Sequence, residues 1–333
     1  MRQQTRSRIA DGLDRTRLLL PAERLREGWL ALRVHEQAET GTDGLPVPPP
    51  RLRLLVDGRT GDGEAFLRLG AQMCDSIRGA VAAAEAPVER MRAVLDFGCG
   101  CGRVARHWAA VAGPEIYGCD YNPELVAWCQ ANLPNLRATR NELAPPTPYV
   151  TGSFDLIYAL SVFSHLDEVL QRGWLAEFRR LLRPGGLLVL SVLGERLRHR
   201  LDPEEQQRFD CGEMIVQRPR MAGRNLCTVY HPAPTSPARC SRTSARSAAS
   251  TSARPLSRSS KRPTWPACRR ALSYGRARPP VTATKACQAG FGLNFALSRK
   301  RPTESQKVQE PRWSFQENQK TCLRLSRLWF SSR

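Results

Sequence analysis

The chain has 333 residues, of which 41% are hydrophobic, and its formal net charge at pH 7 is +20. That apolar content is enough for one sizeable core, and no apolar run is as long as a transmembrane helix, so we expect no membrane span. Eleven cysteines without a C-x-x-C pair, and a charged N-terminus without a secretory apolar segment, predict reduced thiols and a cytoplasmic location.

The first 59 residues are expected to form a helical extension followed by a linker. Ala22–Glu39 has the periodicity of an amphipathic helix, and four prolines then occupy five positions within 46–50, which favours an extended chain. Beyond this linker, apolar residues recur at helical spacing over Glu64–Ala84. This spacing predicts a helix that either packs on the main domain or covers its cleft.

Short apolar runs and helical periodicities alternate through the next part of the chain. Strands are predicted at Ala93–Phe97, Glu115–Cys119, Leu136–Ala138, Phe154–Ala159 and Leu187–Val192. Helices are predicted at Arg103–Val111, Pro123–Leu133 and Val169–Leu182, the last of these ended by a Pro-Gly-Gly turn. This rhythm is typical of a Rossmann-like α/β fold, a doubly wound and mostly parallel sheet whose ligands bind beyond the carboxyl ends of the strands.

A glycine-rich loop follows the first of these strands. Asp96 is followed by glycines at 98, 100 and 102, and such a loop allows a ligand to approach the backbone closely. A dinucleotide fingerprint would need a glycine where Arg103 stands, so the spacing argues against NAD. A carboxylate at the strand end would also repel a pyrophosphate but accept hydrogen bonds from an ammonium group, which favours a cationic ligand.

These motifs resemble those of the class I S-adenosylmethionine-dependent methyltransferases. The strand, acid and glycine loop are similar to the family's first motif; Glu115–Asp120, Phe154–Ala159 and Leu181–Leu190 are similar to later ones, in the family's order. The resemblance covers roughly residues 60–231 and implies S-adenosylmethionine as cofactor, with Asp120 chelating its ribose hydroxyls. The other contacts implied for the loop are Asp96, Gly98, Cys99, Gly100 and Gly102.

The sequence offers three further candidate site residues, each with two possible roles, and one cysteine pair that could be considered as a metal site. Asn141 resembles the position at which the family contacts adenine, but it could equally cap a helix or turn. Tyr121 could stack on the cofactor or simply cover the cleft, and His165, after the fourth strand, could be a general base or a structural residue. Cys99-x-Cys101 lacks further ligands, so we expect no metal.

The resemblance implies an enzyme that transfers the methyl group of S-adenosylmethionine to an acceptor by SN2 displacement. No acceptor motif is visible and the core lacks a basic patch, so a small molecule is the expected acceptor. The alternative is a non-catalytic protein that binds the cofactor, or one that binds nucleic acid through a basic tail.

The composition changes abruptly near His231. Residues 1–231 contain 30 Lys and Arg and 28 Asp and Glu, whereas residues 232–333 contain 21 and 3. Three hypotheses compete for this tail: a disordered arm that binds nucleic acid or lipid, a small folded unit within 286–330, and a coding sequence read out of frame, which we favour. The expected division is thus an extension (1–59), a methyltransferase domain (60–231) and a basic, low-complexity tail (232–333).

This division affects the sheet. The family's sheet normally ends with a helix and an antiparallel strand pair after the fifth strand, and no such pair is evident in the sequence. We therefore expect a sheet that lacks its final antiparallel strands and leaves an open edge at Leu187–Val192.

Overall fold

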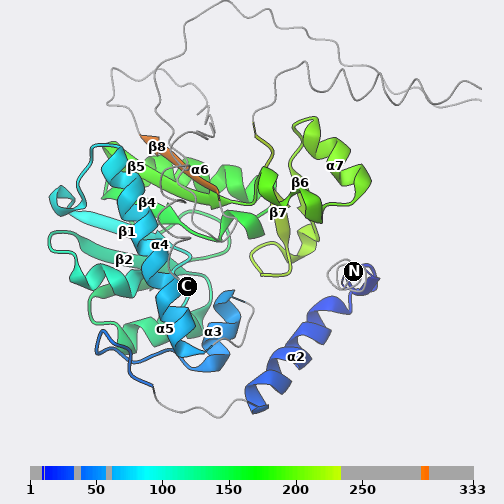
Figure 1. Cartoon of the computed structure of the whole chain (residues 1–333), viewed down its shortest axis with the longest axis horizontal. Coiled ribbons are helices and arrows are strands. Elements are labelled where there is room, and N and C mark those ends of the chain that lie inside the picture. The colour runs from blue at the N-terminus through cyan, green and yellow to red at the C-terminus, as the bar shows by residue number, and fades with distance from the viewer. Residues whose placement is uncertain (1–9, 11, 34–38, 58–61, 234–293, 300–333) are drawn as a thin grey trace, which may run out of the picture.

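The chain forms one large sheet and a small two-stranded one (Figure 1). The structure is a computed structural model that describes residues 10, 12–33, 39–57, 62–233 and 294–299. The large sheet has the order β3-β2-β1-β4-β5-β8, and its first five strands are parallel. Their bounds are β1 Ala93–Phe97, β2 Glu115–Asp120, β3 Leu136–Arg140, β4 Phe154–Ala159 and β5 Leu182–Val192. The Rossmann-like α/β fold is confirmed.

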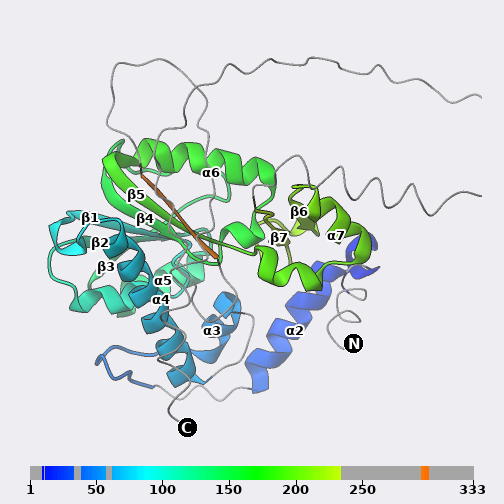
Figure 2. The ribbon, with the colours of Figure 1, turned by 45° about the horizontal axis from the view of Figure 1, so that its top comes forward.

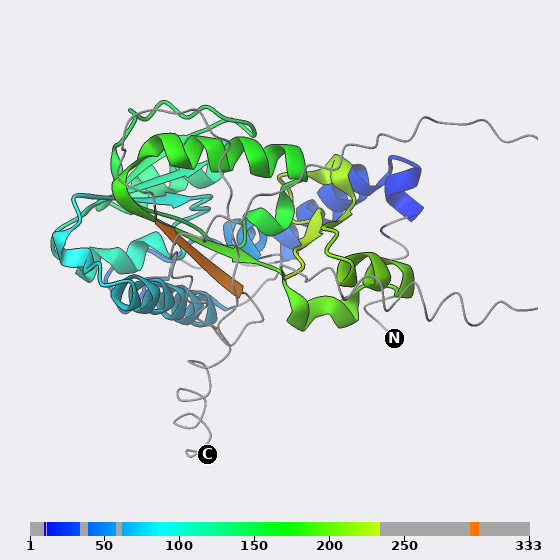
Figure 3. The same ribbon diagram turned by 90° about the horizontal axis from the view of Figure 1, so that it is seen from above.

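Helices cover both faces of this sheet. One face packs against α4 (Gly63–Ala83), the 3-10 helix η2 (Ala105–Ala110) and α5 (Pro123–Asn132), and the other packs against α6 (Glu168–Leu181) (Figures 2 and 3). Strand residues alternate between the two cores, as the pleat requires, so Val94 packs toward α4 while Leu95 packs toward α6. No helix in the described part of the chain has the length and apolar character needed to cross a membrane.

The segment after the glycine loop differs from the expectation. Arg103–Val111 was predicted as an α-helix, but the structure has turns followed by the 3-10 helix η2. The N–H groups of His107 and Val111 donate to carbonyls three residues earlier, at Val104 and Trp108. The tighter winding fits a short connection in which Arg106 and Trp108 are both buried.

The proline-rich linker is shorter than predicted. Helix α3 (Pro50–Asp57) begins at the last of the four prolines, where the missing N–H costs nothing because the first turn has no intrahelical acceptor for it. The preceding helix, α2 (Leu19–Arg33), overlaps the predicted amphipathic helix and starts three residues before it, while residues 34–38 lie outside the described residues.

A small subdomain follows β5. It consists of α7 (Pro203–Asp210) and the antiparallel pair β6 (Ile215–Gln217) and β7 (Thr228–Tyr230). Cys227 and Val229 pack with Leu19 of α2 in one apolar cluster, so the N-terminal helix and this subdomain lie against each other.

The expectation of an open edge at β5 is corrected by β8 (Asn294–Arg299). This strand pairs antiparallel with β5, from Leu187 opposite Arg299 to Val192 opposite Asn294. The backbone of Leu187–Val192 is therefore paired on that side, so one antiparallel strand is present at the edge that was predicted to lack such strands. Residues 234–293 and 300–333 lie outside the described residues, so the hypotheses for the tail stay predictions.

Candidate cofactor and acceptor site

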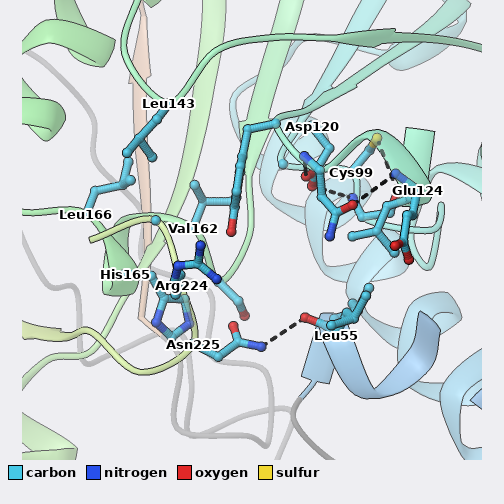
Figure 4. Close-up of a pocket in the computed structure, with 18 of the residues that line it drawn as sticks. Leu55, Cys99, Asp120, Glu124, Leu143, Val162, His165, Leu166, Arg224 and Asn225 are labelled. Carbon is cyan, nitrogen blue, oxygen red and sulfur yellow. Dashed lines mark hydrogen bonds between the residues drawn. The ribbon is translucent and has the colours of Figure 1, made fainter. Parts of the chain in front are cut away.

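A cavity of about 590 Å³ opens at the carboxyl ends of the strands (Figure 4). It lies where the strand order reverses between β1 and β4, the position at which doubly wound sheets bind ligands. Eight of the nine site residues expected from the sequence line it: Asp96, Gly98, Cys99, Gly100, Asp120, Tyr121, Asn141 and His165. The ninth, Gly102, does not.

The glycine loop needs glycine at all three alternate positions, but for different neighbours. Gly98, Gly100 and Gly102 have φ values of +74°, +56° and +73°. A Cβ on Gly98 would lie 2.4 Å from Val162 Cγ2, whereas one on Gly102 would lie 2.2 Å from Leu133 Cδ1. Gly102 therefore lets Leu133, the residue that follows α5, pack against the loop, while Gly98 faces the segment after β4.

Asp120 joins the loop to the end of β2. Its Oδ2 accepts a hydrogen bond from the Gly100 N–H at 3.0 Å, and its Oδ1 accepts one from the Asn122 N–H at 2.8 Å. Burial raises the pKa of this carboxyl, and the backbone donors oppose the shift. Each carboxylate oxygen retains a second lone pair, so the group fits a ribose diol as a further donor pair.

Asp96 is the second buried acid of the cavity. Burial raises its pKa to about 7; the Asp120 carboxylate adds to this shift, while Tyr158 and Arg103 oppose it. An ammonium group bound here would stabilise the ionised form and lower the pKa again. The acidic end of the cavity thus fits a ligand that carries positive charge.

Asn141 presents an acceptor without a partner. Its Nδ2 donates to the Glu142 carbonyl at 2.6 Å, which orients the amide, and its buried Oδ1 has no hydrogen-bond partner among the described residues. No helix begins at Asn141, so the capping alternative finds no support there. The free oxygen fits an amino donor such as that of adenine. Tyr121, 38% exposed, lies at the rim.

His165 lies across the cavity, in the 3-10 helix η3 (Phe163–His165). Its Nδ1 is 2.7 Å from the Cys227 carbonyl oxygen, which can only accept, so Nδ1 carries the proton and Nε2 has the free lone pair. Burial lowers the pKa of the ring, which keeps it neutral near pH 7. The Gly223 N–H donates to the His165 carbonyl at 2.7 Å, so the segment before β7 holds the histidine at two points.

Three residues that were not among the predicted site residues line the same cavity as His165: Ser161, Arg224 and Asn225. Ser161 has φ of +58°, an uncommon conformation for a residue with a Cβ, and its N–H donates to Ser191 Oγ at 2.7 Å. Arg224 and Asn225 come from the loop before β7, and the Asn225 Nδ2 donates to the Leu55 carbonyl at 2.9 Å (Figure 4). None of these belongs to a motif, so no sequence signal indicated them.

The fold and this cavity define a Rossmann-like domain of the kind that binds a nucleoside-containing ligand at its switch point. Residues 94–186 match the model of a family described as "Methyltransferase domain". We therefore identify this part of the chain as a class I S-adenosylmethionine-dependent methyltransferase domain, with S-adenosylmethionine as its cofactor.

Two curated relatives are methyltransferases by name. The chain is 30% identical over 98 residues to a demethylmenaquinone methyltransferase of Chlorobaculum parvum, covering 29% of this chain and 39% of that one. It is 31% identical over 110 residues to a ubiquinone biosynthesis O-methyltransferase of Cereibacter sphaeroides, covering 32% and 43%. The chain thus spans about two fifths of these relatives' length.

A solved structure with a partial likeness is SAM-bound CalS10, an amino pentose methyltransferase from Micromonospora echinaspora involved in calicheamicin biosynthesis. It is 22% identical to this chain, and the match has a TM-score of 0.34. The match covers 55% of this chain and 65% of that one.

Proposed function

We propose that the whole chain is a methyltransferase that acts on a small-molecule acceptor, with His165 as its general base. The observation that carries this proposal is that one cavity joins the acidic glycine loop to a neutral imidazole whose Nε2 is unprotonated. The relatives named above act, by their names, on quinone precursors, which supports a small acceptor.

In this proposal, one group of residues binds the cofactor and a second group takes up the proton of the acceptor. S-adenosylmethionine, when bound, supplies an electrophilic methyl group on a sulfonium centre. Asp96, Asp120 and Asn141 would orient it at the ends of β1, β2 and β3, through its ammonium, ribose and adenine groups. Nε2 of His165 would take the proton of the acceptor's hydroxyl or amine, and the Cys227 carbonyl would stabilise the resulting imidazolium through Nδ1–H.

The cofactor half of this proposal is tested by calorimetric titration of S-adenosylhomocysteine into the full chain. We expect Asp120→Ala to weaken the affinity about tenfold or more, because two charge-assisted hydrogen bonds to the ribose are lost. Asp75→Ala, on the exposed side of α4, is the matched control and should leave the affinity unchanged. Equal affinity of wild type and Asp120→Ala would exclude the assigned role of Asp120.

The catalytic half is tested with His165→Asn, whose amide can still donate to the Cys227 carbonyl. We expect kcat to fall about 100-fold or more, with S-adenosylhomocysteine affinity unchanged. Since burial lowers the pKa of His165, the acidic limb of the wild-type rate profile should lie below pH 6.5, the ordinary pKa of the ring. The readout is S-adenosylhomocysteine release in the presence of a panel of phenols, alcohols and amines. A variant as fast as wild type would remove His165 from the chemistry.

We further propose that the protein works in the reducing cytoplasm. Seven cysteines of the described residues are free thiols, and all but Cys211 are buried. Burial raises the pKa of Cys227 to about 11 and that of Cys74 to about 12, which keeps both as unreactive thiols.

A further inference from the structure

Acidic and basic side chains are unevenly distributed along the lining of the cavity. Its inner end, where β1 and β2 finish, carries the two carboxyls of Asp96 and Asp120 and one arginine, Arg103, whereas its opposite walls carry arginines from α2, α3 and the loop before β7. The cationic cofactor belongs at the acidic end, because the arginines would repel its sulfonium. The basic end is therefore left for the acceptor.

Arg224 is the arginine of the cavity wall that is best placed to bind the acceptor. Figure 4 shows its side chain directed into the cavity, on the same side as His165. Among the other arginines that line the cavity, Arg26 pairs with Glu23 and Arg51 pairs with Glu124 at 2.7 Å. Arg103 acts on the Asp96 carboxyl at the acidic end, and Arg24 is an exposed residue of α2. Arg224 is an exposed residue, and within the described part of the chain its guanidinium makes no ion pair or hydrogen bond with protein, so it is available to a ligand that enters the cavity.

The backbone that carries Arg224 is fixed relative to the general base. The Arg224 N–H donates to the Met221 carbonyl at 3.0 Å, and the Arg224 carbonyl accepts from the Cys227 N–H at 3.0 Å. Cys227 in turn holds Nδ1 of His165. One short turn therefore sets the position of both the guanidinium and the imidazole.

We propose that the acceptor carries an anionic group, a carboxylate or a phosphate, which Arg224 binds while the acceptor's hydroxyl or amine faces His165. A guanidinium presents several donors in one plane and pairs with either group through two parallel hydrogen bonds. Such pairing fixes the orientation of a small acceptor as well as its affinity, which in-line transfer requires. This inference rests on the proposed function, since it assigns the substrate class of the same site.

The test uses the full chain saturated with S-adenosylhomocysteine. Calorimetric titration compares three matched sets of probes: aliphatic and aromatic hydroxy acids, the corresponding phosphate monoesters, and the corresponding neutral hydroxy amides. We expect the tightest probes to be anionic, and Arg224→Gln to weaken them about tenfold or more while leaving the amides unchanged. Arg220→Gln, an exposed arginine on η5 (Pro219–Met221) outside the cavity lining, is the control. The acid and phosphate sets identify which anion is bound.

The outcomes separate the two proposals. Binding of S-adenosylhomocysteine together with equal affinity for acids and amides, or with an anion preference that survives Arg224→Gln, overturns this inference alone. Failure of wild type to bind S-adenosylhomocysteine overturns the proposed function and this inference with it. Loss of the anion preference in Arg224→Gln, with cofactor-product affinity retained, supports the inference.

Discussion

Asp96 shows how a single residue is placed for binding at the expense of stability. Its carboxyl is buried at the end of β1, and its pKa is raised to about 7 from an ordinary value of 3.8. A raised acid pKa means that the folded protein holds a proton that the unfolded chain releases, so stability falls as the pH rises from about 4 through about 7. Without a cationic ligand, ionisation of Asp96 therefore destabilises the folded protein.

We expect Asp96→Asn to stabilise the protein in the absence of cofactor, and to do so more strongly at high pH. Because the pKa is about 7 in the folded protein instead of 3.8, the gain from Asp96→Asn is on the order of 4 kcal/mol above pH 7, about half of that near pH 5.5, and about zero below pH 4. Thermal unfolding at about pH 5.5 and about pH 8.5 measures the difference. A gap between variant and wild type that does not widen with pH would contradict this account, and S-adenosylhomocysteine should stabilise wild type more than the variant.

The residues of the cofactor end could be predicted because their signal is local. Asp96, the glycines and Asp120 stand at fixed distances from apolar strands, and eight of the nine expected residues line the cavity. Gly102 follows the same sequence pattern but does not line the cavity, because it faces Leu133. This contact depends on how α5 packs against the loop, which the sequence pattern does not show. Arg224 could not be predicted, because a loop before β7 brings it to the site and no motif marks that loop.

At the scale of elements, β1 and β4 have the predicted bounds, since a strand buried on both faces reads as a short apolar run, and α4, α5 and α6 match their predicted bounds to within one residue at each end. β5 begins five residues before its predicted start, so it includes the residues of the predicted Pro-Gly-Gly turn. η2 was predicted as an α-helix and α3 was not predicted, because the form of both short segments depends on partners far away in the sequence. The last strand, β8, follows β5 by about 100 residues, so no local pattern connected the two.

At the scale of the whole molecule, a partly buried ion pair ties the N-terminal segment to the domain. Arg106, on η2, has a fully buried side chain whose Nε and Nη2 donate to Asp43 at 2.7 and 2.8 Å. The carbonyls of Leu45 and Pro46 accept from the same guanidinium. Burial alone would raise the pKa of Asp43, but the hydrogen bonds from Arg106 and the Leu45 N–H reverse the shift and lower it.

We expect Asp43→Asn to destabilise the fold by about 2 kcal/mol, because it leaves the buried Arg106 charge without its counter-charge. The native pair contributes its stability at neutral pH and loses it only as the pH falls below the ordinary aspartate value of 3.8, through the lowered pKa. Urea unfolding at pH 7 measures the effect. Asp75→Asn, which removes an exposed pair with Arg78, should change stability by less than about 0.5 kcal/mol. Equal effects of the two variants would show that Arg106 finds other partners.

The hydrogen bond from Asn225 to the Leu55 carbonyl joins two walls of the cavity that are 170 residues apart in the chain. It is solvent-exposed, and a single bond of this kind contributes only about 1 kcal/mol. Such a bridge opens and reforms readily by thermal motion, whereas the sheet beneath it stays intact. Any movement of α3 away from the loop before β7 would have to break this bond, which adds only about 1 kcal/mol of resistance to a widening of the cavity between them.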